Sequence, residues 1–306
     1  MQPRTRRRLS VALAVVIVAA AAAGLARTLS RHWPEVQRAV RDANWGLLVA
    51  SLLVAALAVA CIAQRWHATL HALGATVPLG DATRWFMTGQ MGKYAPGGVW
   101  HLVGQGELAT RGGVPRRAAY ASVILSTVVL VSAAAVVVAG GAVLPGTDTP
   151  WWAVGFGAGI TAVILEPHLR RLLLAKAGVD DSGLGVRRLL GLVTGSLPAW
   201  FLVGLATWLV ARAFSPSVSL GTIVVAGVAS WLVGIVTLPA PGGIGVREAV
   251  LTAALRDDLG SGTAALVALT ARMVFLAADV GWFVAARVWT VRAAAGRVVS
   301  EAEPSP

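Results

Sequence analysis

The chain has 306 residues and a formal net charge of +12; 57% of its residues are hydrophobic and only 13% are charged. Because soluble domains carry about 25% charged residues, this composition excludes a soluble globular protein and predicts an all-α, polytopic helical membrane protein. Its apolar runs are continuous rather than alternating, which argues against a β-barrel. The excess of basic residues indicates loops that contact anionic lipid headgroups. We expect no nucleic acid as a partner.

Seven apolar runs approach or exceed the roughly 20 residues that a helix needs to cross a bilayer. The first resembles a secretory signal peptide, but its apolar part is long, so we expect it to remain as an uncleaved span. In chain order the runs are residues 9–25, 45–63, 117–144, 151–165, 189–210, 220–238 and 263–289.

The distribution of Lys and Arg predicts the orientation in the plasma membrane. The basic start RTRRR, the basic loop 167–188 and the basic tail indicate cytoplasmic N- and C-termini. The arginines of the loop 27–41, expected outside, contradict this rule. We expect one membrane domain over residues 1–290 and a disordered cytoplasmic tail over residues 291–306.

Two cytoplasmic termini require an even number of crossings. The seven apolar runs therefore need an eighth crossing, supplied by one of two interrupted segments: residues 83–103 or the segment around LPAPGGIGVREAVL. The interrupted segment that does not cross could form a re-entrant hairpin. The expected fold therefore has about 7–8 transmembrane helices plus one or two broken or re-entrant helices.

The two interrupted segments share the sequence APGG, at Ala95-Pro96-Gly97-Gly98 and Ala240-Pro241-Gly242-Gly243. A β-branched residue follows each, and then an acidic one, Glu107 or Glu248. Breaks of this kind in both halves of a chain point to the substrate site of transporters built from repeats, which suggests an internal duplication. The alternative is a pair of kinked helices whose glycines allow close packing.

Unsatisfied backbone groups cannot face lipid, so each break must face protein or water. A helix that restarts at Ile244 presents free N–H groups and a positive dipole end, which suit a phosphate or carboxylate. Ionisable residues near the breaks point to the same site. We expect Arg272 to pair with Glu248, and Arg247 to face the anion.

His101 and Gln105 lie one helical turn apart and could bind a headgroup or seal the helix break. No catalytic group, cofactor, metal cluster or ATP-binding motif is recognised, so we expect neither an enzyme nor direct ATP hydrolysis. The residues predicted to bind the headgroup are Lys93, Pro96, Gly97, Gly98, His101, Gln105, Glu107, Pro241, Gly242, Gly243, Gly245, Arg247, Glu248, Arg272 and Asp279.

The segments GQMGKYAPGGVWHLVGQGELATRGGV, LPAPGGIGVREAVL and ARMVFLAAD resemble the lysylphosphatidylglycerol synthase transmembrane-region family, also called the flippase-like domain, over residues 45–289. In its two-part members this region moves a modified phospholipid to the outer leaflet, and a soluble domain makes that lipid. No soluble synthase domain is recognised here, so the resemblance implies lipid handling without naming the lipid. The family motif carries over to Pro241, Gly242, Gly243, Gly245, Arg247 and Glu248, and a later arginine to Arg272.

Two functions follow as hypotheses. The first is a lipid translocase that binds an anionic phospholipid or polyprenyl headgroup at the paired breaks, with membrane lipids as its partners. It would run down a gradient or couple to ions through Glu107, Glu248 or Asp279. The second is a non-transporting membrane scaffold for a lipid-modifying or glycosyltransferase enzyme. The oligomeric state stays open.

Overall fold

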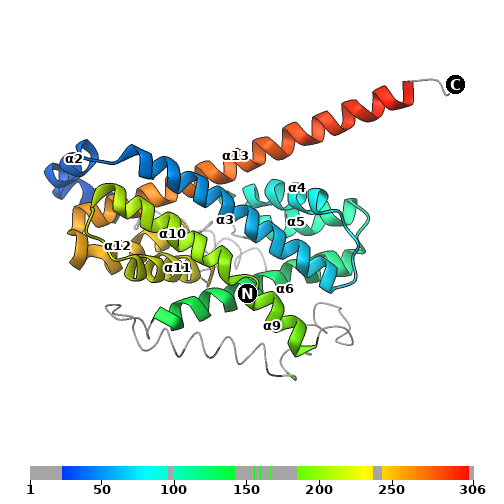
Figure 1. Cartoon of the computed structure of the whole chain (residues 1–306), viewed down its shortest axis with the longest axis horizontal. Coiled ribbons are helices and arrows are strands. Elements are labelled where there is room, and N and C mark those ends of the chain that lie inside the picture. Colours follow the sequence, from blue (N-terminus) through cyan, green and yellow to red (C-terminus); the bar gives the residue numbers. More distant parts are fainter. Residues whose placement is uncertain are drawn as a thin grey trace, which may run out of the picture.

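In the part of the chain that it describes, the computed structural model consists of helices joined by short connections (Figure 1). Described are residues 23–95, 99–141, 155, 159, 166, 168, 185–236 and 243–302, without the side chains of 291–302. The elements are α2 (Trp33–Arg41), α3 (Trp45–Ala72), α4 (Leu79–Gln90), η1 (Met91–Tyr94), α5 (Trp100–Arg111), α6 (Arg116–Gly141), α9 (Val186–Thr194), α10 (Leu197–Phe214), α11 (Leu220–Val236), α12 (Val246–Leu259) and α13 (Ser261–Ala302).

The predicted all-α membrane fold is confirmed. Within the described residues four helical stretches are long and apolar enough to cross a membrane, namely Trp45–Ala72, Arg116–Gly141, Val186–Phe214 and Ser261–Thr290. They correspond to the second, third, fifth and seventh apolar runs. Most of the first run and of the fourth lies outside the described residues. The last helix, α13, continues to Ala302, so helical structure extends into the predicted tail.

The first interrupted segment folds into a helical hairpin, in which α4 and α5 pack antiparallel on either side of the short helix η1. A Cβ atom at Gly89 would lie 2.7 Å from Gln105 Cγ, and Gly112 lies against the ring of Trp85. These two contacts pair the late part of α4 with the middle of α5, and the middle of α4 with the residue after α5. Both ends of the hairpin therefore lie at one end of the bundle, where α3 ends and α6 begins.

The sixth apolar run and the second interrupted segment together fold in the same way, as a hairpin whose arms are α11 and α12. Near the tip, Gly234 lies against Arg247 and Gly243, and farther out Ile223 and Leu255 belong to one buried cluster. The arm α11 begins just after α10 ends, and α12 ends where α13 begins. This hairpin therefore enters the bundle from the opposite end. Since both hairpins return to the end where they start, neither interrupted segment supplies the expected eighth crossing. The sixth apolar run is the first arm of the second hairpin and is not a complete crossing either.

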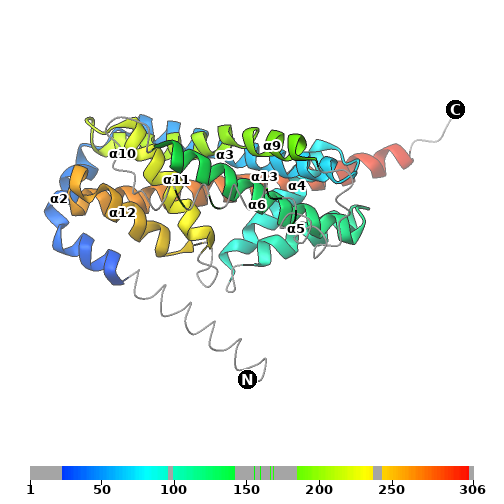
Figure 2. The same ribbon diagram turned by 90° about the horizontal axis from the view of Figure 1, so that it is seen from below.

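The two halves of the described chain repeat the order helix, hairpin, helix: α3, α4–α5 and α6 in the first half, and α10, α11–α12 and α13 in the second. The helices α3 and α10 run antiparallel, because the Ser51 hydroxyl donates to the Ala206 carbonyl (2.8 Å) and the Asn44 N–H donates to the Ala213 carbonyl (2.9 Å). Each final helix packs on the hairpin of the other half, α6 on α11 and α13 on α4. The halves therefore have the same order of elements in inverted orientation, and their hairpins approach each other near the middle of the bundle (Figure 2).

Glu35 of α2 caps the N-terminus of α13. Its Oε1 accepts hydrogen bonds from the backbone N–H and from the hydroxyl of Thr263, both at 2.9 Å. Gly262 makes room for this contact, since a Cβ atom there would lie 2.8 Å from Glu35 Oε2. A carboxylate is favourable at the positive end of a helix dipole. The cap therefore ties the polar helix α2 to the beginning of the last long helix.

Replacing Glu35 with Gln is expected to lower the free energy of unfolding at neutral pH by about 1 kcal/mol, as loss of a helix cap does. Burial acts to raise the pKa of Glu35, but the hydrogen bonds from Thr263 outweigh it and hold the pKa below its ordinary value of 4.5. The stabilisation is therefore complete above pH 4.5 and is lost as the pH falls through the lowered pKa. Thermal unfolding measured from pH 3 to pH 7 should show a smaller acid-induced loss in the variant. Equal losses in both proteins would assign the acid sensitivity to other groups.

Replacing Gly89 with Ala is expected to destabilise the protein by about 1–3 kcal/mol, because the added methyl group overpacks the hairpin. The new Cβ would lie 2.7 Å from Gln105 Cγ and 2.9 Å from Gln105 N. The matched control is Gly104→Ala on the facing arm, where the nearest atom outside the helix lies at 3.5 Å. That variant should be neutral or slightly stabilising, since alanine favours helix over glycine. Similar unfolding temperatures for the two variants would contradict the close packing of α4 on α5.

Candidate functional site

A cavity of about 190 Å³ lies where the two hairpins meet. Its wall is largely apolar and includes the aromatic rings of Phe86, Trp200 and Trp231. The polar side chains of the wall come from α4, η1, α5, α6 and α12, and they are Gln90, Lys93, His101, Gln105, Ser126, Thr127 and Arg247. Gly243, near the tip of the second hairpin, also lines the cavity.

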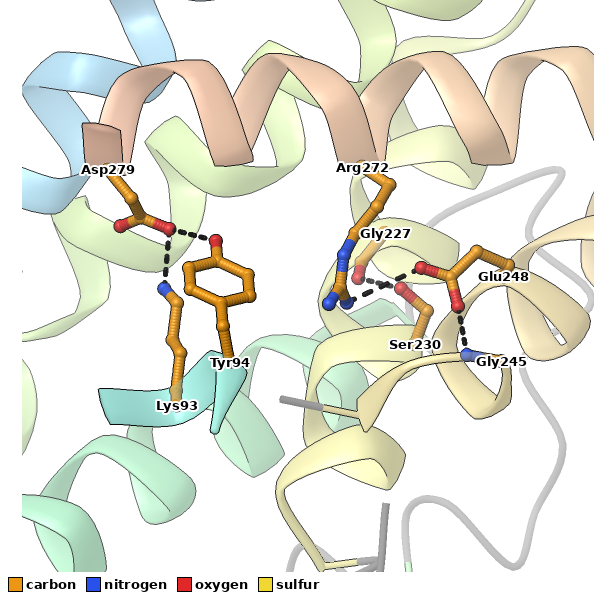
Figure 3. A network of polar contacts seen from close by, with 8 residues as sticks. All are labelled: Lys93, Tyr94, Gly227, Ser230, Gly245, Glu248, Arg272 and Asp279. Carbon is orange, nitrogen blue, oxygen red and sulfur yellow. Dashed lines mark hydrogen bonds and ion pairs between the residues drawn. The ribbon is translucent and has the colours of Figure 1, made fainter. Parts of the chain in front are cut away.

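Lys93 and Tyr94 of η1 both bind the carboxylate of Asp279 in α13 (Figure 3). Lys93 Nζ and the Tyr94 hydroxyl each lie 2.6 Å from Asp279 Oδ2. Only 1% of the Asp279 side chain and 13% of the Lys93 side chain are exposed. Removing one partner of such a pair leaves the other as an uncompensated buried charge, so the contact holds the tip of the first hairpin on α13.

Arg247, in the first turn of α12, stacks on an aromatic ring at the cavity wall. Its guanidinium carbon lies 3.5 Å from the centroid of Trp231, which in turn packs edge-on against Trp200 and Phe275. The glycines Gly234 and Gly243 leave the space that the Arg247 side chain occupies. Its Nε is buried without a hydrogen-bond partner, and within the described residues no carboxylate forms an ion pair with it. The stacking fixes the guanidinium while leaving its hydrogen-bonding capacity incompletely used.

Glu248, the next residue, makes a second polar contact, with Arg272 and Gly245 (Figure 3). Its Oε1 lies 3.4 Å from Arg272 Nη1, and its Oε2 accepts a 2.6 Å hydrogen bond from the backbone N–H of Gly245. Gly245 has a φ of 86°, a left-handed conformation that favours glycine. The predicted pairing of Arg272 with Glu248 is confirmed. One of the backbone N–H groups that we predicted to be available to an anion, that of Gly245, instead donates its hydrogen bond to Glu248.

The charges of this site do not balance among its described residues. Lys93, Arg247 and Arg272 are cations, and Glu248 and Asp279 are carboxylates. One positive charge therefore remains in a largely buried region, and the Arg247 side chain at the cavity wall is the cation without a carboxylate. Buried charge without a partner is costly, so this cavity favours an anionic ligand.

A larger cavity, of about 730 Å³, lies on the other side of these polar contacts. It runs between residues 24–28 and the helices α12 and α13. Tyr94, Glu248 and Arg272 line it, whereas Lys93 and Arg247 line the smaller cavity. The polar network of Figure 3 therefore forms a wall between two cavities.

The structure brings most of the predicted site residues together. Lys93, His101, Gln105, Gly243 and Arg247 line the smaller cavity, and Gly245, Glu248, Arg272 and Asp279 belong to the adjoining network. Pro96, Gly97, Gly98, Pro241 and Gly242 lie outside the described residues.

Glu107 is not among the residues that line either cavity. Its carboxylate pairs instead with Arg111 one turn later on α5, at 3.2 Å, and 74% of the Arg111 side chain is exposed. The reason is helical geometry, since Glu107 lies two positions after Gln105 and the two side chains therefore point to nearly opposite faces of the helix. This prediction therefore does not hold for the cavity wall.

Sequence reasoning missed Tyr94 and Trp231. Tyr94 is one of only two tyrosines and follows a lysine inside the break, a position that does not fit an interfacial belt. Trp231 lies deep in an apolar run, with Arg247 and Lys93 over its ring at 3.5 and 5.8 Å. Both positions differ from the membrane–water interface where tryptophan and tyrosine are enriched, and this was the available signal.

The chain matches the family model described as "Lysylphosphatidylglycerol synthase TM region" over residues 9–281. A comparison with curated proteins gives no match. The matched region includes both hairpins and all the site residues discussed above. The chain is therefore a membrane protein that belongs to the lysylphosphatidylglycerol synthase TM region family.

Proposed function

We propose that this protein moves an anionic membrane lipid between the two leaflets and binds the phosphate or pyrophosphate of its headgroup in the smaller cavity. The observation that carries the proposal is Arg247, a buried guanidinium at the cavity wall without a carboxylate partner among the described residues. A phosphate accepts bidentate hydrogen bonds from such a group and neutralises the remaining positive charge. His101 and Gln105, on the α5 arm of the first hairpin, supply further polar groups to the same cavity wall.

The shape of the site also supports a lipid as the ligand. Aromatic and aliphatic side chains make up most of the wall of the smaller cavity, so a headgroup there would be surrounded by apolar groups except at its phosphate. The larger cavity lies beyond the wall formed by Tyr94, Glu248 and Arg272. A headgroup that passed this wall would exchange one cavity for the other, while its tails stayed in the bilayer.

The proposal assigns no covalent chemistry to the site. Transport would run down the gradient of the lipid or would be coupled to protons or ions. Glu248 and Asp279, which belong to the wall between the cavities, are the candidate carriers. The predicted location is the plasma membrane, with both termini in the cytoplasm.

The test is reconstitution of the purified protein in liposomes that contain fluorescent phosphatidylglycerol, with fluorescent phosphatidylcholine in a parallel sample. Accessibility to a membrane-impermeant quencher measures how fast each lipid reaches the outer leaflet. We expect faster exchange of the anionic lipid, and protein-free liposomes set the background. Equal exchange rates for the two lipids would contradict the binding of an anionic headgroup in the smaller cavity.

No exchange of any lipid by correctly folded protein would contradict transport and favour the second hypothesis, a membrane scaffold for a lipid-modifying or glycosyltransferase enzyme. A stable complex with such an enzyme, isolated from the native membrane, would then be expected. Mass spectrometry of lipids from a deletion strain, combined with leaflet-specific labelling, would identify the lipid and the direction of its movement.

A further inference from the structure

Two histidines and a backbone carbonyl form a close triangle at the end of α3, away from the cavities. His67 Nε2 lies 2.9 Å from the carbonyl oxygen of Val77 and 3.0 Å from His71 Nε2. His71 Nε2 lies 3.2 Å from the same oxygen. The proposed lipid site uses none of these three residues.

No arrangement of protons on neutral imidazoles makes all three contacts attractive. The carbonyl oxygen only accepts hydrogen bonds, so each nitrogen needs a proton to bond it. If both nitrogens carry a proton, two N–H groups face each other. If only one carries it, the lone pair of the other nitrogen faces the lone pairs of the carbonyl oxygen. The three groups instead share the ability to donate an electron pair to one cation.

The geometry suits a metal ion of the borderline class. Histidines at positions i and i+4 present their nitrogens on one helix face and form a common zinc-binding pair. Two imidazole nitrogens bound tetrahedrally to one zinc ion lie roughly 3.3 Å apart, close to the 3.0 Å between His67 and His71. Imidazole selects zinc, nickel and copper over magnesium and calcium.

The surroundings are compatible with a cation. The helix α3 ends at Ala72, so both histidines lie in its last two turns, near the negative end of the helix dipole. His71 is exposed, which leaves coordination positions open to water. Within the described residues no group of three His, Cys, Asp or Glu side chains could hold a metal, so the third protein ligand of this site would be the Val77 backbone carbonyl.

We propose that His67, His71 and the Val77 carbonyl bind a divalent transition metal ion, with zinc, nickel and copper as the class. The ion ties the last turns of α3 to the residue pair that precedes α4. Since α4 leads directly into η1, the metal fixes the base of the hairpin that carries Lys93 and Tyr94.

The experiment uses the full chain, purified in detergent without a polyhistidine tag. Zinc binding is measured by calorimetry, and the electron paramagnetic resonance spectrum of added Cu²⁺ reports the nitrogen ligands. We expect one ion per chain, coupling to two nitrogens, and displacement of Cu²⁺ by excess zinc. Single variants His67→Ala and His71→Ala should bind more than about 10- to 100-fold more weakly, because loss of a residue that only orients a metal ligand already costs that much.

The matched control is His32→Ala, a histidine outside this site whose side chain is 43% exposed, which should bind zinc as tightly as the wild type. His71→Gln keeps a polar side chain and serves if His71→Ala does not fold, with folding checked by thermal unfolding without metal. Absence of zinc binding by the wild type at micromolar concentrations would overturn the site. So would undiminished binding by the double variant His67→Ala, His71→Ala. Because lipid exchange is measured separately, either result leaves the proposed function untouched.

Discussion

Replacing Arg247 with Gln is expected to slow the exchange of anionic lipid in liposomes by about 10- to 100-fold. This factor follows from the roughly 1.5–3 kcal/mol that a hydrogen bond to a charged group contributes, since each 1.4 kcal/mol corresponds to about a factor of ten. Glutamine keeps a hydrogen-bond donor but removes the charge and the flat guanidinium that stacks on Trp231 at 3.5 Å. The same assay with fluorescent phosphatidylcholine should change much less.

Two comparisons make the Arg247 result specific. Arg247→Lys keeps the charge but loses the stacking and the bidentate geometry, so its rate should lie between those of the wild type and of Arg247→Gln. Arg111→Gln removes an arginine whose side chain is 74% exposed, and it should leave the rate unchanged. If Arg247→Gln exchanges anionic lipid as fast as the wild type while its unfolding temperature is normal, Arg247 does not bind the headgroup.

Replacing Asp279 with Asn is expected to lower the free energy of unfolding by about 3–5 kcal/mol, because it leaves the ammonium group of Lys93 buried without its carboxylate. Asparagine preserves the size of the side chain and can still accept the hydrogen bond from Tyr94. The large effect therefore isolates the charge pair, whose two groups lie 2.6 Å apart with only 1% of the Asp279 side chain exposed. Chemical unfolding in detergent measures the difference.

The double variant Lys93→Met, Asp279→Asn should be more stable than Asp279→Asn alone, since it removes the unpaired charge. The control for pair removal is Glu107→Gln, which breaks the exposed contact with Arg111 and should change stability by less than about 1 kcal/mol. If Asp279→Asn and Glu107→Gln are equally mild, Lys93 and Asp279 do not form a buried pair in the folded protein.

The sequence predicted the composition of the site better than its topology. Proline, glycine and charge inside apolar runs are local signals, and they identified Lys93, Arg247 and Gly243 before any packing was known. The pairing of Arg272 with Glu248 was also predictable, because few charges are available in this part of the membrane region. The partners of Asp279 were not, since Lys93 and Tyr94 are far from it in the sequence and only folding brings them together.

The direction of each hairpin depends on long-range packing that a hydropathy pattern does not contain. A length argument was nevertheless available for the second one. Its arms, α11 and α12, have 17 and 14 residues, fewer than the roughly 20 that a helix needs to cross the hydrocarbon region. Two helices that are each too short to cross the membrane and are joined by a break are more consistent with a hairpin that returns to the side where it started than with a crossing.

The inverted relation between the two halves has an energetic consequence. Each half consists of a helix, a hairpin and a helix, and the second enters the bundle from the opposite end to the first. If the halves exchange conformations, the helix packing that one half gives up is regained at corresponding positions in the other. Two such end states would have similar free energies, so neither would be strongly favoured by the protein itself. Under the proposed lipid transport, the concentrations of lipid or coupling ion on the two sides would then decide the direction of net movement.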